Sequence, residues 1–181
     1  MEITWYGHSC FRLTERSLAT VVTDPFDNKS IGYSALKLKS DIVTVSHDAP
    51  GHSNTDAVKG VSHVIDGAGE FEIGGVFVTG VSTDGGGSGK KKGKDASGSN
   101  TIYVFDYDGI TVAHLGDLQQ IPTQSEIESL GTINVALVPV GRSTERAIDR
   151  LGRRRESLPL LFTSTSPPVA PPARGGSCRT T

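Results

Sequence analysis

The sequence predicts an α+β fold, with a β-rich first half and helices packed outside it. Short segments rich in β-branched and aromatic residues recur between turns up to residue 140. An Asp108-Gly109 pair stands between two of them, which is a hairpin signal, and one capped helical segment separates the last two apolar segments. The length of 181 residues fits one domain with a core of modest size.

The first three segments, residues 2–6, 10–14 and 18–23, are separated by polar turns and predict consecutive antiparallel strands. Thr123 and Glu126 form a capping box, which predicts a short helix through Leu130 and makes residues 110–140 a βαβ-like passage. Six further strands are expected at residues 41–46, 61–65, 76–81, 101–106, 110–114 and 135–140.

The composition changes at residue 141. Ten basic residues, eight of them Lys, and seventeen acidic residues precede Arg142, whereas residues 142–181 hold eight Arg, no Lys, three acidic residues and five of the nine prolines. We therefore expect a domain at residues 1–141 and an Arg/Pro-rich tail at residues 142–181, which is either a shifted reading frame or disordered. Within the tail we expect a helix over residues 143–156, an apolar tetrad (Leu158, Leu160, Leu161, Phe162) and disorder over residues 166–181.

Several classes of protein are excluded by the same composition. No apolar run is long enough to cross a bilayer and the first residues lack the features of a secretory signal, so we expect a cytoplasmic protein with no membrane partner. Cys10 and Cys178 are too few and too far apart to predict a disulfide framework or a thiolate zinc site. The lysines of residues 84–100 have no aromatic residue among them, so we expect no nucleic-acid partner.

Histidines and carboxylates follow the ends of apolar strands. His47 and His52 lie in the loop after the strand at 41–46, with Asp48 beside them. His114 is the last residue of the strand at 110–114, and Asp117 follows it closely. His8 follows the first strand. Imidazole and carboxylate groups suit zinc, iron or manganese. From these residues alone, metal binding and ordinary solvated loop positions are about equally well supported.

The order of seven short motifs resembles that of the metallo-β-lactamase superfamily, and more narrowly its bacterial metal-dependent hydrolase-like branch, which is related to the sugar-lactone hydrolases. The motifs, which span residues 1–141, are GHSCF, TDPF, VTVSH with a second His, GGVFVTG, NTIYVF, AHLGD and VALVPVG. The resemblance implies an αββα sandwich with a metal site at one edge, between the two sheets. The C-terminal part is expected to be atypical or incomplete for that fold.

The resemblance also implies an incomplete metal site. The family's loop reads H-x-H-x-D-H, whereas here Ala49 and Gly51 stand at the positions of the middle His and the Asp. His47 and His52 match the outer histidines, and Asp117 matches the bridging Asp. The family's other two histidines, expected near residue 83 and after the strand at 135–140, have no counterpart. Of these ligand positions, only His47, His52 and Asp117 therefore remain.

Other residues are expected to complete or support this site. His8 or Asp48 fills a gap among the metal ligands. Asp24 supports the metal loop through hydrogen bonds, or simply begins a turn with Pro25. His114 supports the site in the same way, or caps the end of its strand. We expect the Asp117 carboxylate within roughly 8 Å of the His47 or His52 imidazole, a span that one ion and its ligands can bridge.

The implied function is that of a metal-dependent hydrolase-like protein with an incomplete metal site. If it is active, metal-activated water attacks a small-molecule ester, lactone or phosphoester, and the cofactor is zinc or another divalent metal, bound weakly or at one position. No residue is assigned as a catalytic acid or base. The alternative is a non-catalytic binding or scaffold protein of the same fold that has lost its metals. An exposed sandwich edge also suggests a homodimer.

Overall fold

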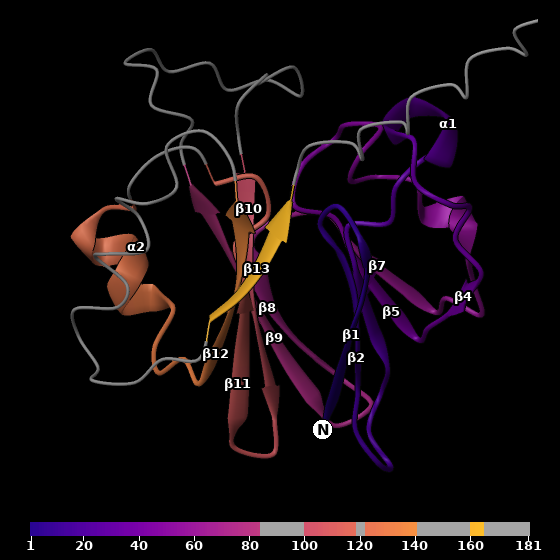
Figure 1. The fold of residues 1–181 in the computed structure, drawn as a ribbon. Helices are drawn as coiled ribbons and strands as arrows, with labels where there is room; N and C mark the ends of the chain where they lie inside the picture. Colours follow the sequence, from indigo (N-terminus) through magenta and orange to yellow (C-terminus); the bar gives the residue numbers. More distant parts are fainter. Residues whose placement is uncertain (84–99, 119–121, 141–159, 165–181) are drawn as a thin grey trace, which may run out of the picture.

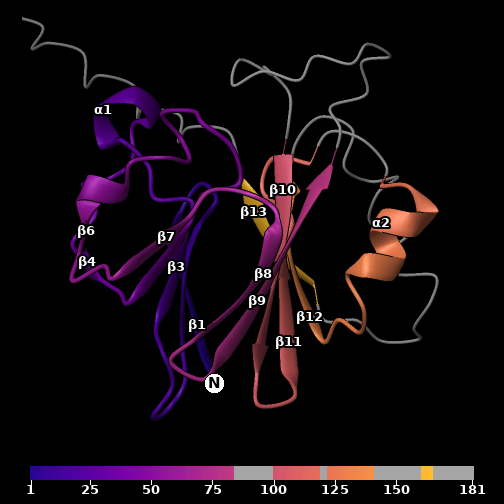
Figure 2. The same ribbon diagram turned by 180° about the vertical axis from the view of Figure 1, so that it is seen from behind.

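The computed structural model describes residues 1–83, 100–118, 122–140 and 160–164. Two β-sheets pack face to face, with short helices on their outer sides (Figure 1). Seen from behind, the helices flank opposite sides of the sheet pair (Figure 2). Among the described residues, no helix is long and apolar enough to span a membrane.

The first sheet has the strand order β1-β2-β3-β5-β7. Its first three strands pair antiparallel, and β3, β5 and β7 pair in parallel. The parallel half matters for function because the carboxyl ends of parallel strands meet at one edge of a sheet. The strands are β1 (Glu2–Gly7), β2 (Cys10–Thr14), β3 (Val21–Thr23), β5 (Ile42–Thr44) and β7 (His63–Ile65).

The second sheet has the order β13-β12-β11-β10-β9-β8. Strands β8 to β11 pair antiparallel, and β11, β12 and β13 pair in parallel. The strands are β8 (Gly69–Ile73), β9 (Val76–Thr83), β10 (Asn100–Tyr107), β11 (Ile110–His114), β12 (Val135–Val140) and β13 (Leu160–Ser164).

The remaining elements cover the outer faces of the sheets. Helix α1 (Asn28–Ile31), the 3-10 helix η1 (Thr55–Ala57) and the small sheet of β4 (Leu38–Lys39) and β6 (Val58–Lys59) belong to the segments outside the first sheet. Helix α2 (Gln124–Ser129) lies outside the second sheet, where Leu130 and Leu118 pack onto it. These layers form the αββα sandwich that the sequence predicts.

Apolar residues fill the space between the sheets. Phe11, Leu13 and Ile42 of the first sheet pack against Phe105 and Leu137 of the second, all of them almost fully buried. Burial of this kind removes apolar area from water and is the main favourable contribution to folding. The two sheets therefore form one core, and residues at their shared edge have fixed positions.

Two buried tyrosines of β10 also connect the sheets by hydrogen bonds. The Tyr103 hydroxyl lies 3.1 Å from the carbonyl oxygens of both Val45 and Ile65, and the Tyr107 hydroxyl lies 3.1 Å from that of Ala19. Each hydroxyl can donate to these carbonyls, which belong to segments of the first sheet and its connections. Burial raises the pKa of both phenols, so both remain protonated donors at neutral pH.

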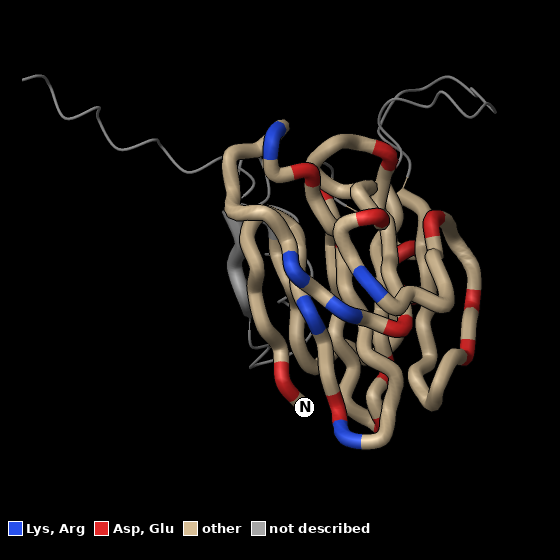
Figure 3. The backbone as a smooth tube through the Cα atoms, turned by 90° about the vertical axis from the view of Figure 1, so that its right-hand side faces the viewer, with Lys and Arg blue, Asp and Glu red and all other residues tan. Residues whose placement is uncertain are grey.

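In the view of Figure 3, several Lys and Arg positions lie near one another in the middle of the molecule, and most of the Asp and Glu positions lie toward its margins.

The structure confirms the predicted strands to within a few residues, together with the antiparallel β1-β2-β3 meander and the Asp108-Gly109 hairpin. It also confirms the capping box of Thr123 and Glu126 and the parallel β11-α2-β12 passage. Within the expected tail, β13 pairs in parallel with β12 over part of the apolar tetrad. The expected helix at 143–156 and the expected disorder at 166–181 lie outside the described residues.

Candidate functional site

The site residues come together where several strands end. His8 follows β1, Asp24 follows β3, the loop of residues 45–54 follows β5, and His114 is the last residue of β11. Strand β1 begins at the N-terminus marked in Figure 1, so the site residues lie at the end of the sandwich opposite to the N-terminus. Residues from both sheets therefore meet at one end of the molecule.

Asp24 is the fully buried centre of this cluster. One of its carboxylate oxygens accepts the Ser46 backbone N–H at 2.7 Å, and the other accepts the Ser46 hydroxyl at 2.6 Å and His52 Nδ1–H at 2.7 Å. Burial alone would raise the pKa of Asp24, but the nearby charge of His114 and the hydrogen bonds of His52 and Ser46 outweigh it and hold the pKa below its ordinary value. Asp24 is therefore an ionised acceptor that orders the loop after β5.

Asp24 also fixes which nitrogen of two histidines carries a proton. His52 donates from Nδ1, so a neutral His52 presents the lone pair of Nε2. The Ser46 hydroxyl gives its proton to Asp24, so it can only accept from His47 Nδ1, which lies 3.0 Å away, and His47 Nε2 is left with its lone pair. The two rings lie side by side, with centroids 4.0 Å apart. One carboxylate thus leaves the Nε2 lone pairs of two imidazoles available, which is the form in which a histidine can ligate a metal.

His8 approaches the same pair from the turn after β1. Its Nε2 lies 3.2 Å from His52 Nε2, and its side chain is buried. Burial, and then the neighbouring His52, lower the pKa of His8 from 6.5 to about 4, although Asp24 and Asp117 act in the opposite direction. His8 is therefore neutral at pH 7. The structure brings together three of the predicted ligands, His8, His47 and His52.

The two predicted carboxylate ligands differ in their surroundings. Asp117 is partly buried in the loop after β11, and its backbone N–H donates to Asn100 Oδ1 at 3.0 Å. Burial and the neighbouring His52 lower the pKa values of both His8 and His47, and the negative charge of Asp117 partly offsets this lowering. Asp48 is exposed and accepts a hydrogen bond from the Ser53 hydroxyl. Asp117 thus acts electrostatically on the histidine cluster, while Asp48 stands at its rim. The predicted separation of roughly 8 Å for Asp117 stays a prediction.

His114 lies beneath the cluster, fully buried at the end of β11. Its Nε2 lies 3.1 Å from the Ser9 carbonyl oxygen, to which it donates, and 4.0 Å from the Asp24 carboxylate. Burial lowers the pKa of His114, and the Asp24 charge partly offsets this. This contact joins the second sheet to the β1-β2 turn, a position that fits a supporting role and not a ligand.

Three polar residues that carry no role in the sequence analysis complete the network. Ser46 joins Asp24 to His47, Ser9 accepts from His114, and the Asn100 side chain joins the loop of Asp117 to β10. Only the position of Ser46, directly before His47, offered a sequence signal. Ser9 and Asn100 are far from their partners along the chain, so only the tertiary structure reveals them.

The comparisons with known proteins identify the family. The family model of the beta-lactamase superfamily domain matches residues 2–151. The chain belongs to the metallo-beta-lactamase superfamily. The match extends ten residues beyond the predicted domain boundary at residue 141, which stays a prediction.

Relatives within the superfamily include proteins of known structure. A UPF0173 metal-dependent hydrolase of Methanoculleus marisnigri is 30% identical over 165 residues, which covers 78% of this chain and 69% of the relative. A protein of Thermotoga maritima, named a Zn-dependent hydrolase of the metallo-beta-lactamase superfamily, is 36% identical with a TM-score of 0.62, covering 82% and 70% of the two chains. A Parabacteroides distasonis protein with a TM-score of 0.61 over 89% and 91% of the chains is only 17% identical and shows the fold alone.

The donor chemistry of this superfamily member fits a metal ion, but the donors do not yet surround one. Neutral imidazoles with fixed tautomers and a nearby carboxylate are ligands that zinc accepts. The buried His8 Nδ1 has no hydrogen-bond partner among the described residues, whereas His8 Nε2 is within hydrogen-bonding distance of His52 Nε2. Within the described ranges, no three of the His, Cys, Asp and Glu side chains converge closely enough to hold an ion as they stand.

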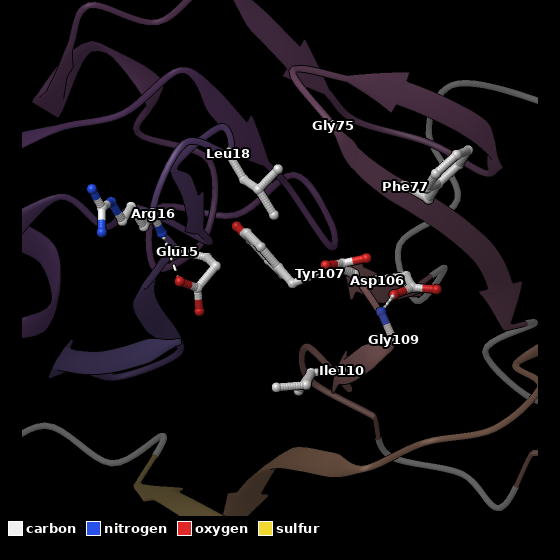
Figure 4. Close-up of a pocket in the computed structure, with 10 residues that line it drawn as sticks. Glu15, Arg16, Leu18, Gly75, Phe77, Asp106, Tyr107, Gly109 and Ile110 are labelled. Atoms are coloured by element: carbon white, nitrogen blue, oxygen red, sulfur yellow. Dashed lines mark hydrogen bonds between the residues drawn. The ribbon is translucent and has the colours of Figure 1, made fainter.

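A separate pocket of about 550 Å³ lies at the opposite end of the sandwich, beside the β10-β11 hairpin (Figure 4). Several of its polar groups are already engaged: the Tyr107 hydroxyl lies within bonding distance of the Leu13 and Ala19 carbonyls, and Asp106 accepts from the Gly109 backbone. Glu15 pairs with the N-terminal amine. This pocket offers no group prepared for chemistry, so the histidine cluster remains the candidate site.

Proposed function

We propose that the chain is a metal-dependent hydrolase-like protein that binds one divalent ion weakly, with zinc the best chemical match. The buried Asp24 carboxylate carries the proposal, because it orders His52 directly and His47 through Ser46 so that both rings can ligate a metal. A carboxylate that fixes the tautomer of a neighbouring histidine is a common feature of metal sites. The relatives named as metal-dependent hydrolases support the same function.

His47, His52 and Asp117 are the proposed ligands, with His8 in reserve and Asp48 at the rim. A bound ion would supply an activated water at neutral pH for attack on an ester, lactone or phosphoester of a small molecule. The chain's own residues do the rest: Asp24 keeps the imidazole protons on Nδ1, and Asp117 places a negative charge beside His8 and His47. Ala49 and Gly51 add no carboxylate that could orient the water.

Elemental analysis tests this proposal. Untagged protein is dialysed against a mild chelator, its metal content is measured, and hydrolysis of a nitrophenyl ester, a lactone and a nitrophenyl phosphodiester is assayed with and without added Zn²⁺. We expect at most one equivalent of metal, lost at modest chelator strength, and Zn²⁺-dependent turnover of at least one substrate. Two tightly held equivalents would show that the site is not incomplete.

The alternative is a non-catalytic binding or scaffold protein of the same fold. It is favoured by Gly51, which stands where the resembling family has an Asp and allows the His8 ring to occupy the space beside it. Protein that binds no Zn²⁺ at millimolar concentration and hydrolyses none of the three substrates would establish this alternative.

A further inference from the structure

His8 and His52 are joined by a direct hydrogen bond, and their surroundings decide which ring donates. The two Nε2 atoms lie 3.2 Å apart, a distance at which two lone pairs would repel each other. The proton of a neutral His52 is on Nδ1, which donates to the Asp24 carboxylate at 2.7 Å. The proton between the rings therefore belongs to His8, which donates from Nε2 and keeps a lone pair on Nδ1. This agrees with the lack of a partner for the buried His8 Nδ1 among the described residues, because a buried acceptor is left unpaired more often than a buried N–H.

The turn after β1 holds the His8 ring in this position. The register of β1 and β2 shifts between Trp5 and Gly7, and His8 adopts a left-handed conformation with φ 50°. The Trp5 indole N–H donates to the His8 carbonyl at 2.9 Å, which fixes the turn from outside. Irregular pairing and a left-handed residue other than glycine both re-aim a side chain, here toward the loop that carries His52.

Gly51 provides the space that the His8 ring occupies. A Cβ atom at position 51 would lie 2.6 Å from His8 Nε2 and 3.1 Å from its Cδ2, closer than an unstrained contact allows. Gly51 does not have a positive φ, so its backbone conformation does not require glycine. The contact between His8 and His52 therefore depends on the missing side chain, and any larger residue at position 51 would push the two rings apart.

This hydrogen bond engages the atom that a metal ion would need. Histidine ligates a metal through the lone pair of a ring nitrogen, and the Nε2 lone pair of His52 already accepts a proton from His8. In the part of the chain that the structure describes, no three His, Cys, Asp or Glu side chains converge on one point. The cluster is thus closed by hydrogen bonds and does not fit an ion in this arrangement.

We propose that His8 blocks the site: its Nε2–H occupies the His52 lone pair in the metal-free protein, and an ion binds only by displacing it. This competition rests on the proposed metal-dependent function, whereas the hydrogen bond itself does not. It gives the weak metal binding proposed above a physical cause, because the ion gains one nitrogen ligand only after a buried hydrogen bond is broken. His8 is then a positioning residue that acts through His52 against the metal, the opposite of a ligand held in reserve.

Nuclear magnetic resonance of metal-free, ¹⁵N-labelled full-length protein at pH 7 tests the hydrogen bond directly. The ring signals should show the Nε2–H tautomer for His8 and the Nδ1–H tautomer for His52, with a scalar coupling across the hydrogen bond between the two Nε2 nuclei. His8→Asn should abolish the coupling but keep the His52 Nδ1–H signal, because Asp24 still accepts that proton. His63→Asn is the matched control, since His63 is an exposed histidine of β7, and it should leave both signals unchanged.

Titration of the full-length variants with Zn²⁺ alone, in competition with a chromophoric chelator, tests the blocking. His8→Asn removes the ring and tolerates the left-handed backbone, whereas Gly51→Ala keeps His8 but takes away its space. Each should tighten Zn²⁺ binding by about 2–10-fold, because the ion no longer has to break a neutral hydrogen bond. The double variant should bind no tighter than His8→Asn alone, since both changes remove the same competitor. His63→Asn should bind as the unchanged protein does, and circular dichroism confirms that each variant is folded.

The two measurements separate failure of the blocking from failure of the proposed function. Weaker or unchanged Zn²⁺ binding in His8→Asn would overturn the blocking while the proposed function stands, and weaker binding would make His8 a ligand. An Nδ1–H tautomer for His8, or the absence of the coupling to His52, would overturn it without any metal. If neither the unchanged protein nor any variant binds Zn²⁺, the proposed function fails, and the competition fails with it even where the coupling is seen.

Discussion

Replacing Asp24 with Asn should destabilise the protein and weaken metal binding together. The two side chains have nearly the same shape, and Asn tolerates the φ of 38° at this position. Asn, however, has one accepting oxygen where Asp24 uses two, so one or two of the three hydrogen bonds from Ser46 and His52 must be lost. A bond to a buried charge is worth about 1.5–3 kcal/mol, partly offset because the charge no longer needs to be buried. The expected loss in the free energy of unfolding is about 2–4 kcal/mol.

Urea unfolding of metal-free protein at pH 7, followed by far-ultraviolet circular dichroism, measures this loss. Asp41→Asn is the matched control, because the Asp41 carboxylate is exposed and accepts the Thr20 backbone N–H. The control should cost less than about 1 kcal/mol. Zn²⁺ affinity should fall about 10–100-fold in the Asp24 variant only. A stability within about 0.5 kcal/mol of the unchanged protein would refute the view that Asp24 organises the loop.

Two further predictions concern acid and the loop after β11. Burial lowers the folded-state pKa of His8 to about 4 and also lowers that of His114, so the unfolded chain binds more protons than the folded chain below about pH 6.5. The urea midpoint of metal-free protein should therefore fall steadily from about pH 7 to about pH 4.5. A constant midpoint over this range would contradict the prediction. Gly116→Ala should destabilise the protein by at least about 2 kcal/mol in the same assay, because its φ is +61° and the new Cβ would lie 2.4 Å from Asn100 Oδ1. Gly131→Ala has a similar φ but open space, so it should show the backbone cost alone, and equal losses in both variants would rule out the steric argument.

The elements that the sequence could predict are those with strong local signals. β-branched runs, an Asp-Gly turn and a capping box depend on neighbouring residues, so β10, β11 and α2 are found close to their expected positions. Strand β8 was missed because GEFEI contains glycine and two glutamates and is held mainly by pairing with β9. Helix α1 was missed because four residues are too few for a periodic pattern.

The candidate site also contains residues that local sequence signals could identify and residues that they could not. His47 and His52 share one loop, so their spacing could be recognised, and the superfamily resemblance added Asp117. The roles of Ser46 and Asn100 could not be predicted, because each depends on contacts between segments that only folding brings together. The contact between His8 and Gly51 is of the same kind, since a missing side chain has meaning only beside the ring that uses its space.

The tyrosine contacts of β10 have a mechanical consequence for this site. Tyr103 and Tyr107 are four residues apart on β10, so their side chains lie on the same face of the strand. Their hydroxyls contact the first sheet at two separate points. Two such contacts oppose both sliding and rotation of one sheet against the other, whereas a single contact would oppose only their separation. The histidines of the first sheet and Asp117 of the second are therefore kept in alignment partly by the two tyrosines, of which Tyr103 bonds the carbonyl of Val45 at the start of the histidine loop. Loosening either tyrosine would disturb the alignment of the proposed ligands without replacing any of them.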